Sequence, residues 1–259
     1  MRALLIGDVV GGVGLRALLA RLPELRERHR PDVVVVNAEN AADGAGTSPR
    51  QARDLLDAGV DVLTGGNHTL RRRELYTTLA AEPRVLRPAN IAVRAPGRGI
   101  VTVTTPAGPV TVVNLLGAVF MDAAHSPFAV VDDLVDEGRR AGPFTIVDVH
   151  AEATSEKIAL ARHLEGRATA VVGTHTHVQT ADARVLPGGT AFISDLGMTG
   201  PHDSVIGVRT DVILQRFLTG APGRFTTADG GVLVQGAVVQ AEAGGRATAI
   251  TPFSVPGPE

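Results

Sequence analysis

Short runs of β-branched residues alternate with helical patterns along most of this sequence, and this alternation limits the possible folds more than any other feature. We predict strands at 2–6, 32–36, 60–63, 144–149 and 169–172, and helices at 13–28, 49–58, 71–80, 129–140 and 155–164. Pro23 should kink or split the first helix, and Ser48 with Pro49 should open the second. Repeated strand-helix-strand units predict an α/β fold with largely parallel pairing.

Two segments depart from this alternation. Between residues 91 and 116, strands are separated by Pro/Gly turns such as 105–109, which indicates antiparallel pairing. Near the end of the chain, we predict strands at 190–194, 231–240 and 246–252 and a helix at 210–218. With 259 residues, of which 44% are hydrophobic, the chain can bury a large core, and we expect one domain spanning 1–259.

The charge balance and the absence of cysteine exclude several classes of function. A formal net charge of −2 leaves no broad cationic surface for duplex nucleic acid, so a small substrate is expected. Without cysteine there is no disulfide framework, thiolate catalysis or Cys-zinc site. Because the apolar runs are too short for a signal peptide or a bilayer span, we expect a soluble cytoplasmic protein without a membrane partner. Homo-oligomer formation stays open.

Five predicted strands are each followed by side chains that can bind a metal. These residues are Asp8; Glu39 and Asn40; Asn67 and His68; His150; and His175 with His177. In open α/β sheets ligands bind outside the carboxyl ends of the strands, so these residues should converge. Any one of them could be a helix cap, a turn residue or a buried histidine. Their recurrence at five strand exits favours a metal centre, and oxygen and imidazole ligands suit Mn, Fe or Zn.

Two other enzyme folds must be weighed. The stretch from Gly12 to Ala17 fits the G-x-G-x-x-A dinucleotide fingerprint, with Glu39 as the ribose-binding acid. However, Asp8 would place negative charge beside the pyrophosphate, and this hypothesis leaves the histidines unexplained. An amidohydrolase barrel also uses an H-x-H pair, but there the pair belongs to the first strand, whereas here it follows two-thirds of the chain.

Six blocks of the sequence closely resemble the bacterial YmdB-type phosphodiesterases of the calcineurin-like metallophosphoesterase superfamily. They are NAENAADGAG (37–46), GGNHT (65–69), RPAN (87–90), DVHAEATSEK (148–157), GTHTHVQTAD (173–182) and DLGMTGP (195–201). The resemblance implies a four-layer αββα sandwich of two mixed sheets. It also implies hydrolysis of small phosphodiesters, with 2′,3′-cyclic nucleotides as the substrate class, and two divalent or trivalent metal ions, iron or manganese. The wider superfamily has D-x-H where this chain has Asp8-Val9-Val10, and a bridging aspartate where it has Glu39.

The resemblance also implies roles for the site residues. One metal would be held by Asp8, Asn40 and His177, the other by Asn67, His150 and His175, with Glu39 bridging both. In this scheme Asn40 contributes its carbonyl oxygen, and a metal-bridging hydroxide attacks the phosphodiester. His68 would protonate the leaving group or only orient its neighbours.

Several supporting residues can be proposed around these ligands. We expect Asp148 to face away from His150 along its strand, and Glu152 and Asp182 to be candidate partners of the histidine N–H groups. By resemblance, Asn90 and the loop 197–200 would border the substrate. A second function stays open, in which the same scaffold is a regulatory or nucleotide-sensing module with little turnover.

Overall fold

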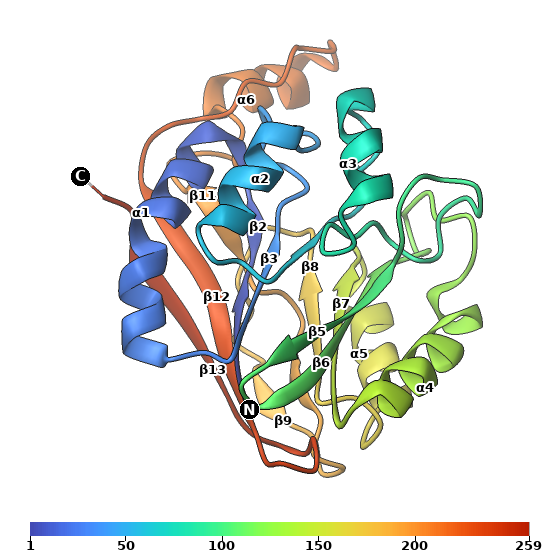
Figure 1. Ribbon diagram of the computed structural model, residues 1–259. Coiled ribbons are helices and arrows are strands. Elements are labelled where there is room, and N and C mark those ends of the chain that lie inside the picture. Colours follow the sequence, from blue (N-terminus) through green and yellow to red (C-terminus); the bar gives the residue numbers. More distant parts are fainter. Residues whose placement is uncertain (259) are drawn as a thin grey trace.

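In the computed structural model, which describes residues 1–258, the predicted β-branched runs form strands of two mixed sheets that face each other (Figure 1). The first sheet has the order β2(Asp8–Val9), β11(Met198–Pro201), β12(Val232–Ala241), β1(Arg2–Ile6), β3(Val33–Asn37), β4(Val62–Thr64), with β13(Ala247–Pro256) paired to β12. The second has the order β5(Ile100–Thr105), β6(Gly108–Leu116), β7(Phe144–His150), β8(Ala170–Thr174), β10(Ala191–Ile193), β9(Arg184–Val185).

Parallel pairing dominates where strands alternate with helices, as predicted. Strand β1 pairs with β3 and β3 with β4, and in the other sheet β6, β7, β8 and β10 are parallel neighbours. The predicted antiparallel hairpin is confirmed for β5 and β6. Residues 91–99 form turns and bends rather than a strand, so that part of the prediction is wrong. The short strands β2, β9 and β11 were not predicted.

The helices lie close to their predicted positions. They are α1(Gly11–His29), α2(Pro49–Asp57), α3(Tyr76–Ala81), α4(Val131–Ala141), α5(Thr154–His163) and α6(Thr210–Thr219), with 3₁₀ turns η1(Arg73–Leu75) and η2(Pro127–Ala129) before α3 and α4. Ser48 caps α2 in a capping box with Gln51, as its sequence indicated. Pro23 does not split α1, because Leu22 and Leu25 are buried on either side of it and anchor the helix to the sheet.

Three apolar cores separate four layers. One core packs α1 and α2 against β1, β3 and β12; a second lies between the two sheets; and a third packs α4 and α5 against β6, β7 and β8. Figure 1 shows these helix pairs on opposite outer sides of the two sheets. The predicted αββα sandwich is therefore confirmed.

This architecture differs from the amidohydrolase barrel and gives the glycine fingerprint a role in packing. The two facing sheets are not a barrel. The glycine fingerprint serves packing, since a Cβ on Gly14 would lie 2.2 Å from the carbonyl oxygen of Thr199 in β11. Within residues 1–258 no helix has the length and apolar character needed to span a membrane.

Candidate metal centre

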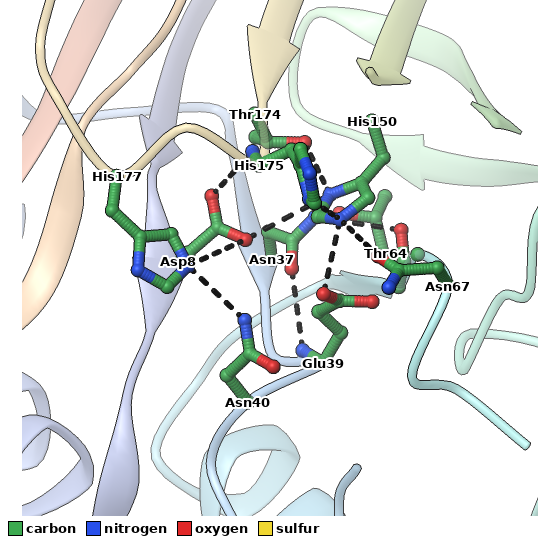
Figure 2. Close-up of polar contacts among 12 residues, drawn as sticks. Asp8, Asn37, Glu39, Asn40, Thr64, Asn67, His150, Thr174, His175 and His177 are labelled. Atoms are coloured by element: carbon green, nitrogen blue, oxygen red, sulfur yellow. Dashed lines mark hydrogen bonds and ion pairs between the residues drawn. The ribbon is translucent and has the colours of Figure 1, made fainter. Parts of the chain in front are cut away.

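The structure brings all seven predicted metal ligands to one end of the two sheets. Asp8 begins β2, Glu39 and Asn40 follow β3, Asn67 follows β4, His150 ends β7, and His175 and His177 follow β8. Figure 2 shows the side chains from both sheets pointing toward one another. Convergence occurs because parallel strands end at the same edge of a sheet and the two sheets pack face to face.

Glu39, His150 and His175 form the tightest group. Each offers one ligand atom, and these atoms lie within 4.8 Å of one another. The Nε2 atom of His150 is 3.0 Å from Glu39 Oε1 and 3.0 Å from His175 Nδ1. Asn67 joins this group, with its Oδ1 atom 3.1 Å from the same Nε2. A set of two oxygen-donor side chains and two imidazoles fits a first-row transition metal.

Asp8, Asn40 and His177 form a second, looser group. His177 Nε2 lies 3.8 Å from Asp8 Oδ1 and 3.2 Å from Asn40 Nδ2. The amide of Asn40 thus turns its nitrogen toward His177, whereas a ligand role requires its oxygen. That oxygen is instead 2.7 Å from His68 Nδ1. Rotating the Asn40 amide by half a turn about its Cβ–Cγ bond would exchange the positions of Oδ1 and Nδ2.

Two buried carboxylate oxygens in this cluster are unsatisfied. Within the described residues, Asp8 Oδ1 and Glu39 Oε1 have no hydrogen-bond partner, although both side chains are fully buried. The 3.0 Å approach of His150 to Glu39 is an ion-pair contact rather than an aligned hydrogen bond. Because unsatisfied buried carboxylates are costly, cations between the two groups would fit this arrangement.

The buried charges shift one another's pKa values. Burial raises the pKa of Asp8 to about 6, against the opposing effects of His177 and His150. Burial also disfavours ionised Glu39, but the charge and close contact of His150, together with the charge and backbone hydrogen bond of His68, outweigh burial and bring the pKa of Glu39 to about 2. Burial works against the charged form of His150 too, yet Glu39 and Asp8 raise its pKa to about 9. A cation at this site must therefore displace a proton from His150.

His175 is kept neutral by its surroundings. Burial, and then the nearby charge of His150, lower the pKa of His175 to about 3. Its Nε2 atom lies 3.1 Å from Glu152 Oε2, which places Glu152 as a partner of a site histidine, as predicted. Asp182 is not such a partner, because it accepts hydrogen bonds from Thr180 and Ser194 instead.

A threonine relay orients His150. The Thr174 hydroxyl donates to Asp148 Oδ1 at 2.8 Å, so its oxygen can accept from His150 Nδ1 at 2.9 Å, which leaves Nε2 facing the cluster. The expectation that Asp148 faces away from His150 is wrong, since residues two apart in a strand share a face. Asn37 and Thr64 also donate to Asp148. The relay was missed because its members carry no metal-site motif, although Asn37 and Thr174 end their strands.

The H-x-H loop has a strained backbone and a buried anchor. His175 and His177 adopt φ values of 99° and 64°, which non-glycine residues seldom occupy. Lys157 is buried in α5 and donates to Thr174 O at 2.8 Å and to Asp195 Oδ2 at 2.9 Å. Asp195 in turn accepts from the backbone and hydroxyl of Thr176. The blocks DVHAEATSEK and DLGMTGP therefore meet beneath this loop.

A cavity of about 560 Å³ opens onto the cluster and is lined by Glu39, Asn40, His68, His175 and His177 among others. The lining does not include Asn90, which is fully buried and donates to two backbone carbonyls. Residues 197–200 are also outside it, because Met198–Pro201 are buried in the first sheet as β11. Neither Asn90 nor residues 197–200 line this cavity, and their position beside a substrate stays a prediction.

Comparison with known proteins identifies relatives along nearly the whole chain. A family model described as "YmdB-like protein" matches residues 4–253. Over 239 residues the chain is 44% identical to a Bacillus subtilis (strain 168) protein named 2′,3′-cyclic-nucleotide 2′-phosphodiesterase, covering 92% of this chain and 90% of that protein.

Two crystal structures share the fold closely. A hypothetical protein from Thermus thermophilus has a TM-score of 0.93 and 44% identity, with both chains covered completely. A structure described as a novel phosphatase from Mycoplasma pneumoniae has a TM-score of 0.92 and 31% identity, covering 99% of this chain and 94% of that one. At these identities the likeness extends beyond the general architecture.

Proposed function

This chain belongs to the family of YmdB-like proteins, and on that premise we propose that it is a metal-dependent phosphodiesterase acting on small phosphodiesters, with 2′,3′-cyclic nucleotides as the substrate class. The name of the B. subtilis relative supports the substrate class. The observation that carries the proposal is the pair of buried, unsatisfied oxygens on Asp8 and Glu39 among three histidines. We treat residues 1–259 as one metallophosphoesterase domain.

The two side-chain groups suggest two metal positions. We assign Asp8, Asn40 and His177 to one and Asn67, His150 and His175 to the other, with Glu39 between them. Oxygen and imidazole donors without sulfur suit iron or manganese. When bound, such ions would polarise the phosphodiester oxygens and acidify an attacking water. The cavity beside both groups has room for a nucleotide-sized ligand.

His68 is the residue we assign to protonate the leaving oxygen. It lines the cavity, its side chain is 28% exposed, and its backbone N–H donates to Glu39 Oε2 at 3.0 Å. Burial lowers the pKa of His68, so the neutral ring is favoured at neutral pH. If Asn40 turns its oxygen toward a cation, its Nδ2 donates to His68 Nδ1. The proton of the neutral ring then sits on Nε2, where it can donate a hydrogen bond to the leaving oxygen, whereas full proton transfer requires the imidazolium form, whose share rises as the pH falls.

Glu39→Gln tests this assignment, because it removes the one charge shared by both positions. We expect metal content, and turnover of 2′,3′-cAMP and bis-p-nitrophenyl phosphate with Mn²⁺, to fall by orders of magnitude. Glu137→Gln, on the exposed face of α4, is the matched control. Unchanged activity in Glu39→Gln would refute the mechanism. Binding of 2′,3′-cAMP without turnover by the metal-loaded wild type would instead favour a nucleotide-sensing module.

A further inference from the structure

A strained turn stands beside the metal centre. Val205 and Val208 exchange backbone hydrogen bonds of 2.9 and 3.0 Å, and the residues between them, Ile206 and Gly207, have φ values of 44° and 99°. Positive φ at both central positions is the geometry of a type I′ turn, which favours Asn or Gly. A β-branched residue there is under strain, and such strain is concentrated at functional sites.

The turn is tied directly to a proposed metal ligand. The carbonyl oxygen of Ile206 accepts a hydrogen bond from His177 Nδ1 at 2.8 Å, which leaves Nε2 directed at Asp8 and Asn40. The Ile206 side chain is 52% exposed and lines the cavity. The strained conformation therefore orients the imidazole through the carbonyl and presents an apolar side chain to whatever binds beside it.

A remote segment adds an aromatic ring to the same side of the cavity. Thr227 pairs with Val208, and Arg209 N donates to Thr226 O at 2.9 Å, so Phe225 is brought beside the turn. Phe225 is 51% exposed and lines the cavity. The Arg216 guanidinium lies 5.0 Å from the ring centre and is not among the residues that line the cavity.

The cavity lining includes four larger apolar residues, Val10, Ile206, Val208 and Phe225, and we call this set the apolar wall. We propose that the apolar wall binds the nucleobase of a cyclic-nucleotide substrate, with the base stacked against Phe225. This inference rests on the proposed function. The phosphate and ribose need polar partners, so only the base gains from an exposed apolar surface held beside the metal ligands. Because the wall consists of apolar side chains, it recognises the flat face of a base and discriminates little between bases.

The test compares two substrates that differ only in the base: 2′,3′-cAMP and methyl ribofuranoside 2′,3′-cyclic phosphate, both with Mn²⁺-loaded protein. Phe225→Ala should lower the ratio of their kcat/KM values by about 5- to 150-fold, the range for a base stacked on an aromatic side chain. Phe225→Tyr should restore the ratio. Phe217→Ala is the matched control, because Phe217 is 79% exposed on α6 and outside the cavity lining, and it should keep the wild-type ratio.

A second readout separates this inference from the proposed function. The affinity for 3′-AMP relative to inorganic phosphate needs no turnover, and it should fall by a similar factor in Phe225→Ala. A wild type that hydrolyses neither substrate would overturn the proposed function, whereas this affinity ratio would still decide the role of the wall. Equal changes for both substrates in Phe225→Ala, or an unchanged affinity ratio, would overturn the base-binding role.

Discussion

Substituting Gly66 by alanine should displace two residues of the metal centre, because there is no room for the added Cβ. A Cβ on Gly66 would lie 2.2 Å from His150 Cδ2 and 2.3 Å from Glu39 Oε2. Ordinary contacts begin near 3.4 Å, so the neighbouring groups must move by about 1 Å. A misplacement of that size can lower the rate by about 10²-fold, equivalent to about 2.7 kcal/mol in the barrier. The backbone of Gly66 does not have a positive φ, so the effect comes from these contacts alone.

Metal analysis and kcat for 2′,3′-cAMP with Mn²⁺ measure this effect. Gly244→Ala is the control, since in the described chain a Cβ there would meet no atom within 4 Å, and it should behave as wild type. Thermal melting of the chelator-treated proteins checks that Gly66→Ala still folds. If Gly66→Ala keeps wild-type metal content and loses less than about three-fold in kcat, then Gly66 is not packed against two working ligands and the reasoning fails.

Two further results are expected. Lys157→Met leaves the carboxylate of Asp195 buried without its charged partner, so the free energy of unfolding measured in urea should fall by about 3–5 kcal/mol. Adding Asp195→Asn should recover part of this loss. A loss below about 1 kcal/mol in Lys157→Met would contradict a stabilising role for the pair. The pKa of His150 is raised to about 9 from its ordinary 6.5, so protonated His150 favours the folded state of the chelator-treated protein. This contribution to the free energy of unfolding should be fully present below pH 6.5 and should be lost as the pH rises through 9. For the same reason, Mn²⁺ binding at pH 8 should release a proton, measured by calorimetry in two buffers, and the absence of release would show that His150 is already neutral.

The predicted positions of the ligands depended on a local rule. A polar residue directly after an apolar strand lies at the carboxyl edge of a parallel sheet, and this rule placed Asp8, Glu39, His150 and the H-x-H pair at one end of the fold. Their proximity in the structure agrees with that placement. The four layers came from the family resemblance, and the three separate cores confirm them.

Residues that support the ligands were predicted less well. Asp148 was placed on the wrong face, and Asp182 was expected to contact a site histidine but bonds to Thr180 and Ser194 instead. Hydrogen-bond partners across two sheets depend on how the sheets pack, which no single segment encodes. The exception is Glu152, whose predicted partnership with a site histidine matches its contact with His175.

The sequence by itself determined which side chains stand at the strand ends, because strand periodicity and the apolar-to-polar boundary are local properties. Tertiary structure alone decided the relay through Thr174, the contact of Lys157 with Asp195 and the meeting of Phe225 with the turn at Ile206. Each of these joins segments far apart in the chain. Their distances follow from the packing of layers and the path of loops, and those are settled only when the whole core is buried.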